Sequence, residues 1–118
     1  MTPLKVMNVT RQTCLVSRGK RATTPWARGI GLLRRGSLPE GDGLLIVPCK
    51  AITSLLMRFS FDAIFLDRQW RVVHILPDMP PNRLSSPVVR AAYAVLEVPA
   101  GTAARTLTQV GDQLEVLD

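Results

Sequence analysis

Short apolar runs recur about seven times along this chain, separated by polar stretches and by turns containing Gly, Pro or Asp. Runs of this length, rich in aliphatic and β-branched side chains, are typical of strands, and their spacing indicates a small sandwich or barrel. The predicted strands are Leu4–Val9, Thr13–Ser17, Leu44–Val47, Phe61–Leu66, Arg71–Leu76, Ala91–Val98 and Leu114–Leu117. A chain of 118 residues is the size of one domain, so we expect residues 1–118 to share one fold.

The strand predicted at 61–66 is apolar on both of its faces. Phe61 and Phe65 lie on one face, and Ile64 and Leu66 lie on the other, because alternate side chains of a strand point in opposite directions. A strand of this kind is covered on both sides. We therefore expect it to be buried on both sides.

Two short helices are predicted beside the strands. Thr24 and Pro25 form a helix start, with threonine as the N-cap and proline at the first helical position. This helix spans Pro25–Arg35, and a second short helix lies within Pro99–Leu107. The expected fold is therefore mainly β, a jelly-roll-like sandwich or β-roll of about seven strands with two short helices.

Basic residues dominate the first third of the chain. Lys and Arg number 15 against 9 acidic residues, and the formal net charge is +6. A basic segment of this kind could bind nucleic acid or another polyanion, or it could simply keep the surface soluble. The chain before Gly36 has no acidic residue and eight basic ones: Lys5, Arg11, Arg18, Lys20, Arg21, Arg28, Arg34 and Arg35.

Metal and cofactor sites are not predicted. Structural zinc needs four Cys or His ligands, and the chain has only Cys14, Cys49 and His74. The N-terminus lacks the apolar core of a secretory signal, and no apolar run approaches the ~20 residues of a membrane span. With two isolated cysteines, we expect reduced thiols and a cytoplasmic protein; a secreted chain whose signal has been removed would have the same features.

Five sequence blocks, taken in order and with their spacing, resemble the family called domain of unknown function 192. The resemblance runs from about residue 4 to the end of the chain. It implies a compact, mostly β fold akin to a jelly-roll sandwich with short helices, and it implies no established activity. The blocks are Arg28–Arg35, Gly43–Cys49, Met57–Asp67, Val95–Thr102 and Val110–Asp112.

The chain departs from the family's pattern at two places. Relatives often carry His-Thr where this chain has Thr53 and Ser54, so a role that needs that imidazole is lost here. Relatives typically have glycine where this chain has Trp70. Because glycine suits a turn position with positive φ, we expect the turn at Trp70 to have changed type.

A polar cluster near the central strand is the candidate binding site. Asp62 would place a carboxylate near the core, and Arg28 is a candidate partner for it. Such a pair could equally be a buried ion pair that fixes packing, and the sequence leaves both interpretations open. The candidate residues are Arg28, Thr53, Ser54, Arg58 and Asp62.

Catalytic patterns are weak in this sequence. A nucleophilic Cys49 would need a neighbouring base, and the expected histidine is replaced by Thr53. No paired carboxylates or phosphate-binding loop can be recognised. We therefore expect a non-catalytic binding or accessory module with an unidentified ligand or protein partner. The alternative is a nucleic-acid or polyanion binder that uses the basic first third.

Overall fold

Seven strands and one short helix make up the regular structure of the described residues, which are 3–24, 36–52, 57–82 and 86–118 of the computed structural model. All seven predicted strands are present; the bounds at 61–66 and 114–117 agree with the prediction, and the other five strands have shifted ends. The predicted helix at Pro25–Arg35 lies outside the described residues, and the second predicted helix is observed as the short α2. The elements are β1 (Leu4–Asn8), β2 (Thr13–Ala22), β3 (Leu44–Ile46), β4 (Phe61–Leu66), β5 (Val72–Met79), β6 (Ala94–Pro99), α2 (Thr102–Arg105) and β7 (Leu114–Leu117).

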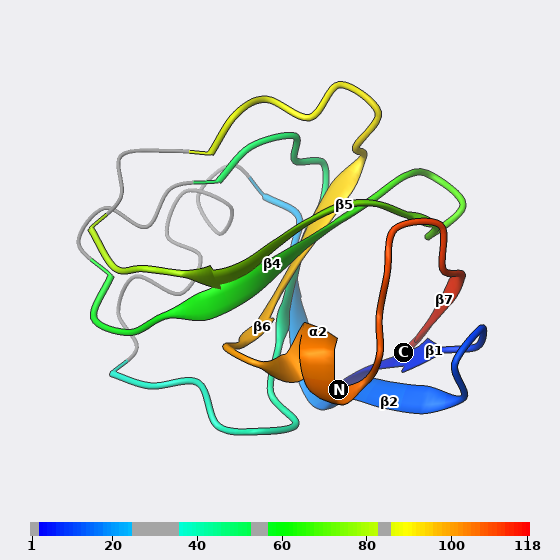
Figure 1. The fold of residues 1–118 in the computed structure, drawn as a ribbon, viewed down its shortest axis with the longest axis horizontal. Helices are drawn as coiled ribbons and strands as arrows, with labels where there is room; N and C mark the ends of the chain where they lie inside the picture. Colours follow the sequence, from blue (N-terminus) through cyan, green and yellow to red (C-terminus); the bar gives the residue numbers. More distant parts are fainter. Residues whose placement is uncertain (1–2, 25–35, 53–56, 83–85) are drawn as a thin grey trace.

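The strands form a single curled sheet, a half-barrel, with the order β5-β4-β6-β3-β2-β1-β7 (Figure 1). Neighbouring strands are antiparallel except for β2 and β3, which are parallel. The mainly β class is therefore confirmed. The expectation of a jelly-roll-like sandwich is corrected, because a sandwich would stack two separate sheets, whereas here every strand belongs to one.

Strand β2 is the reason why the sheet is continuous. Its first part pairs with β1 as far as Gly19, and its last three residues, Lys20 to Ala22, pair with β3. At the crossing point, a Cβ on Gly19 would lie 2.7 Å from Cγ1 of Val16 and 2.9 Å from the carbonyl oxygen of Gly43. Only glycine permits so close an approach. The strand predicted to end at Ser17 thus continues, and joins both parts of the sheet.

The hydrophobic core has two parts, one on each face of the sheet. All six residues of β4 are buried, as predicted for a strand covered on both sides. Phe61 and Phe65 belong to one part of the core, and Ile64 and Leu66 belong to the other. The two-sided alternation read from the sequence is therefore confirmed.

The two ends of the strand order approach each other at one place. The amide of Val72 donates to the carbonyl of Asp112, and the amide of Leu114 donates to the carbonyl of Trp70. The start of β5 is thereby tied to the start of β7, which helps to hold the curl of the sheet. Within the described ranges, no helix has the length and hydrophobicity needed to cross a membrane.

Candidate functional site

Asp62, the acidic member of the predicted site, is buried on β4 with 1% of its surface exposed. Its Oδ1 accepts hydrogen bonds from the amides of Asp78 (2.8 Å) and Gly101 (3.2 Å), and its Oδ2 accepts one from the amide of Ala103 (2.9 Å). Helix α2 follows Gly101 and has no side-chain cap of its own. Because the first amides of a helix lack partners within the helix, the Asp62 carboxylate serves as their acceptor from the sheet.

The other predicted site residues are only partly covered by the structure. Arg58 is exposed and precedes β4. Arg28, Thr53 and Ser54 lie outside the described residues. A ligand site built from these four residues and Asp62 therefore stays a prediction, as does an ion pair between Arg28 and Asp62.

Three arginines of the basic first third form ion pairs with acidic residues from later in the chain. Arg11 Nε lies 3.0 Å from Oδ2 of Asp112, and Arg18 Nε lies 2.8 Å from Oδ1 of Asp42. Nη2 of Arg21 lies 3.0 Å from a carboxylate oxygen of the last residue, Asp118. These carboxylates compensate three of the positive charges on which the prediction of polyanion binding by the first third of the chain rests.

The pair formed by Arg11 and Asp112 belongs to a buried polar network. Oδ2 of Asp112 also accepts hydrogen bonds from the Asn8 side chain and from the amide of Gln109, each at 3.0 Å. Burial alone would raise the pKa of Asp112, but the hydrogen bonds from Arg11, Asn8 and Gln109 together with the Arg11 charge outweigh it and lower this pKa. The network ties the β1–β2 turn to the loop before β7, and its polar groups satisfy one another. It is therefore structural.

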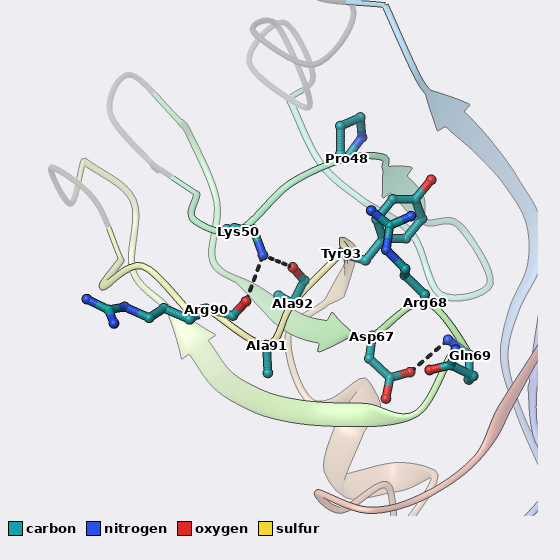
Figure 2. A pocket seen from close by; sticks show the side chains of 9 residues that line it. All are labelled: Pro48, Lys50, Asp67, Arg68, Gln69, Arg90, Ala91, Ala92 and Tyr93. Carbon is teal, nitrogen blue, oxygen red and sulfur yellow. Dashed lines mark hydrogen bonds between the residues drawn. The ribbon is translucent and has the colours of Figure 1, made fainter.

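A shallow hollow of about 400 Å³ lies beside the β4–β5 turn and the segment that leads into β6 (Figure 2). It is lined by three basic residues and one acidic residue, together with polar and apolar side chains. None of the described residues that line it is a Ser, Cys or His that could act as a nucleophile or base. Its residues are Pro48, Lys50, Asp67, Arg68, Gln69, Arg90, Ala91, Ala92 and Tyr93.

Asp67 and Trp70 fix the turn that forms one wall of the hollow. Oδ1 of Asp67 accepts hydrogen bonds from the amides of Gln69 and Arg71, both at 2.9 Å. Trp70 has a φ of 64°, so the backbone takes the positive φ that glycine would suit. The expectation that the turn changes type at Trp70 is therefore wrong: the tryptophan adopts this conformation, and its ring packs against Tyr93, with centroids 6.3 Å apart.

Arg68 projects from this turn and stacks on Tyr93. Its guanidinium carbon lies 4.4 Å from the centroid of the Tyr93 ring. Tyr93 is half-buried, and its backbone is held on two sides: its amide donates to Leu66 and its carbonyl accepts from Cys49. The position of the Arg68 cation is therefore set by a ring that is itself fixed to the sheet.

Lys50 closes the opposite side of the hollow. Its Nζ donates to the carbonyls of Arg90 and Ala92, both at 2.7 Å, as Figure 2 shows. The ammonium group thus anchors the segment that leads to Tyr93. In the same view, the side chain of Arg90 extends away from Arg68.

Comparison with known proteins places the chain in a family. The family model for domain of unknown function 192, described as uncharacterized ACR, matches residues 7–116. The chain belongs to this family. No curated protein matches it.

Two crystal structures resemble this member of the domain of unknown function 192 family. One, of a protein of unknown function from Novosphingobium aromaticivorans DSM 12444, is 26% identical with a TM-score of 0.82, and the match covers 96% of this chain and 83% of that one. The other, from Sinorhizobium meliloti 1021, is provisionally described as a transcription regulator. It is 21% identical with a TM-score of 0.80, and the match covers 96% and 91% of the two chains. The second likeness shows the fold alone.

Sequence reasoning overlooked one acidic residue of this family member. Glu97 lies on β6 between Leu44 of β3 and Ala63 of β4, with 5% of its surface exposed. Burial raises the pKa of Glu97 to about 8. A single acidic residue within the apolar run Val95–Val98 is the signal in the sequence that points to it.

The hollow was also missed, because its residues belong to separate segments of the chain and form no motif. What it offers chemically is positive charge, an aromatic ring and backbone carbonyls. In the part of the chain that the structure describes, no group of three or more His, Cys, Asp or Glu side chains is placed to hold a metal ion. Binding of an anionic group is therefore the chemistry that the lining supports.

Proposed function

We propose that this member of the domain of unknown function 192 family is a non-catalytic binding module that holds a small anionic molecule in the hollow. The observation that carries the proposal is that three basic residues, Lys50, Arg68 and Arg90, line one concave surface. A single acidic residue, Asp67, shares the lining, and one of its oxygens is occupied by two amides of the turn. The hollow therefore has an excess of positive charge.

The distribution of charge over the described residues supports this location. Arg11, Arg18 and Arg21 each have an acidic partner. Arg68 and Arg90 have no acidic partner among the residues that the structure describes. An incoming anion thus meets uncompensated charge at the hollow, whereas at Arg18 and Arg21 of β2 it meets ion pairs.

A thermal-shift experiment with two matched double variants tests the proposal. Arg68→Gln combined with Arg90→Gln removes two positive charges from the hollow. Lys5→Gln combined with Lys20→Gln removes two from exposed positions on β1 and β2. The probes are sodium acetate, succinate, citrate and phosphate and a single-stranded oligonucleotide, each at constant ionic strength.

We expect at least one small anion to raise the melting temperature of the wild-type chain and of the control variant, but not that of the hollow variant. A ligand at ~100 times its Kd stabilises by about 2.7 kcal/mol, which is several degrees for a domain of this size. A shift that persists in the hollow variant would refute the proposal. A shift caused only by the oligonucleotide, lost in the control variant and abolished by salt, would instead support polyanion binding by the N-terminal third.

A further inference from the structure

We infer that the hollow selects a carboxylate group over a phosphate, and that Arg68, whose guanidinium lies over the Tyr93 ring, is the residue that determines this specificity. The inference rests on the proposed function, since it assumes that an anion binds in the hollow. It goes beyond that proposal by naming the chemical group and the side chain that recognises it.

The first step is the fixed orientation of Arg68. The turn that carries it is held by the two hydrogen bonds to Asp67 Oδ1, and its guanidinium lies over the Tyr93 ring. Trp70 packs beside the same ring. The Arg68 side chain is therefore already restricted before an anion binds. Because less conformational entropy is lost on binding, this restriction favours binding.

The second step is that the donors of Arg68 are unused. Among the described residues, its guanidinium has the ring of Tyr93 as a neighbour, but it has no hydrogen-bond acceptor and no acidic partner. The edge of a stacked guanidinium still presents parallel N–H groups. These match the two oxygens of a planar carboxylate, which can accept both hydrogen bonds in one plane.

The third step concerns charge, and it separates a carboxylate from a phosphate. Lys50 already donates to two carbonyls, and the Arg90 side chain extends away from Arg68. Asp67 adds a negative charge to the same lining. One free arginine fork suits a single negative charge, whereas a phosphate near −2 needs several free cations and would be repelled more strongly by Asp67.

The test is an NMR titration of the full chain labelled with ¹⁵N. Sodium acetate and sodium phosphate are added separately, with sodium chloride keeping the ionic strength constant. The signals followed are the Nε–H of Arg68 and the amides of Ala92 and Tyr93. We expect acetate to cause saturable shifts at these positions, at lower concentrations than phosphate.

Two lysine variants distinguish recognition by the planar guanidinium from attraction by positive charge alone. Arg68→Lys keeps the charge but loses the planar donors, and we expect it to weaken acetate binding ~5-fold or more. Arg71→Lys is the control, because Arg71 is exposed on the same turn but does not line the hollow. Both positions are exposed, so both variants should fold.

Each contrary result has a distinct meaning. Phosphate binding at the hollow as tightly as acetate would overturn the carboxylate selectivity and leave anion binding standing. Unchanged acetate affinity in Arg68→Lys would overturn the role of the planar fork. The absence of saturable shifts with either anion would overturn the proposed function as well.

Discussion

Replacing Asp62 with asparagine tests whether this carboxylate holds the fold or binds a ligand. In the structure, its two oxygens accept three backbone hydrogen bonds, and the group is almost fully buried. An asparagine keeps one oxygen, which can still serve the amides of Asp78 and Gly101. Its NH₂ group then faces the amide of Ala103, so that donor meets donor.

The size of the effect follows from these contacts. A buried donor left without a partner costs about 1–3 kcal/mol, and the remaining hydrogen bonds weaken because their acceptor is no longer charged. We therefore expect Asp62→Asn to lower the free energy of unfolding by about 3 kcal/mol. In a domain of this size that corresponds to a fall in Tm of roughly 10 °C.

Urea unfolding, followed by tryptophan fluorescence and circular dichroism, measures the change. Asp78→Asn is the control, because Asp78 is exposed and its contact with Asp62 is made by the backbone. The control should change stability by no more than ~0.5 kcal/mol. An Asp62→Asn chain within ~1 kcal/mol of the wild type would refute the reasoning, since that loss is too small for an orphaned buried amide. If that variant kept its stability but lost ligand binding, Asp62 would be a binding residue, as one interpretation of the sequence holds.

Two further predictions concern the sheet. Burial raises the pKa of Glu97 from 4.5 to about 8. The free energy of unfolding is therefore greatest below the pKa of Glu97 in the unfolded chain, and it falls as the pH rises through the pKa in the folded chain. Glu97→Gln should flatten this fall in urea titrations between about pH 5 and about pH 9, and an unchanged slope would contradict the prediction. Gly19→Ala places a Cβ 2.9 Å from the carbonyl oxygen of Gly43, and it should lower the free energy of unfolding by about 1–3 kcal/mol. Gly36→Ala is the control and should lower it far less, because a Cβ there meets nothing within 4 Å. Equal midpoints for the two alanine variants in urea would exclude the close approach as the cause.

The sequence predicts the elements of this fold better than their arrangement. The six residues of β4 are enough to show apolar side chains on both faces of the strand. This local pattern therefore predicts a strand covered on both sides, whatever the rest of the chain does. The continuation of β2 has no such local signal, because residues 18–21 are mostly polar. Its cause is the approach of Gly19 to Gly43, which is a contact between distant parts of the chain. The half-barrel could therefore not be distinguished from a sandwich.

The candidate site shows the same division. Alternation along β4 predicts that Asp62 lies near the core, and its burial confirms this. Its role as an acceptor depends on backbone amides of β5 and α2. Every residue type other than proline has such an amide, so the sequence does not indicate which amides Asp62 binds. The hollow combines Lys50, Arg68 and Tyr93 from three segments, so no motif could reveal it. At Trp70, the side chain packs well enough against Tyr93 for the backbone to keep a positive φ without glycine.

The fold changes the interpretation of the uneven distribution of charge along the chain. The first third of the chain is basic and residues 97–118 hold four acidic residues against one basic residue, but β1 and β7 are neighbours in the sheet. Arg11 and Arg21 therefore meet Asp112 and Asp118. A polyanion that used these arginines would have to displace carboxylates already in contact with them. An anion entering the hollow displaces no acidic residue from Arg68, as far as the described residues show, and this favours the proposed site in the hollow over the basic first third.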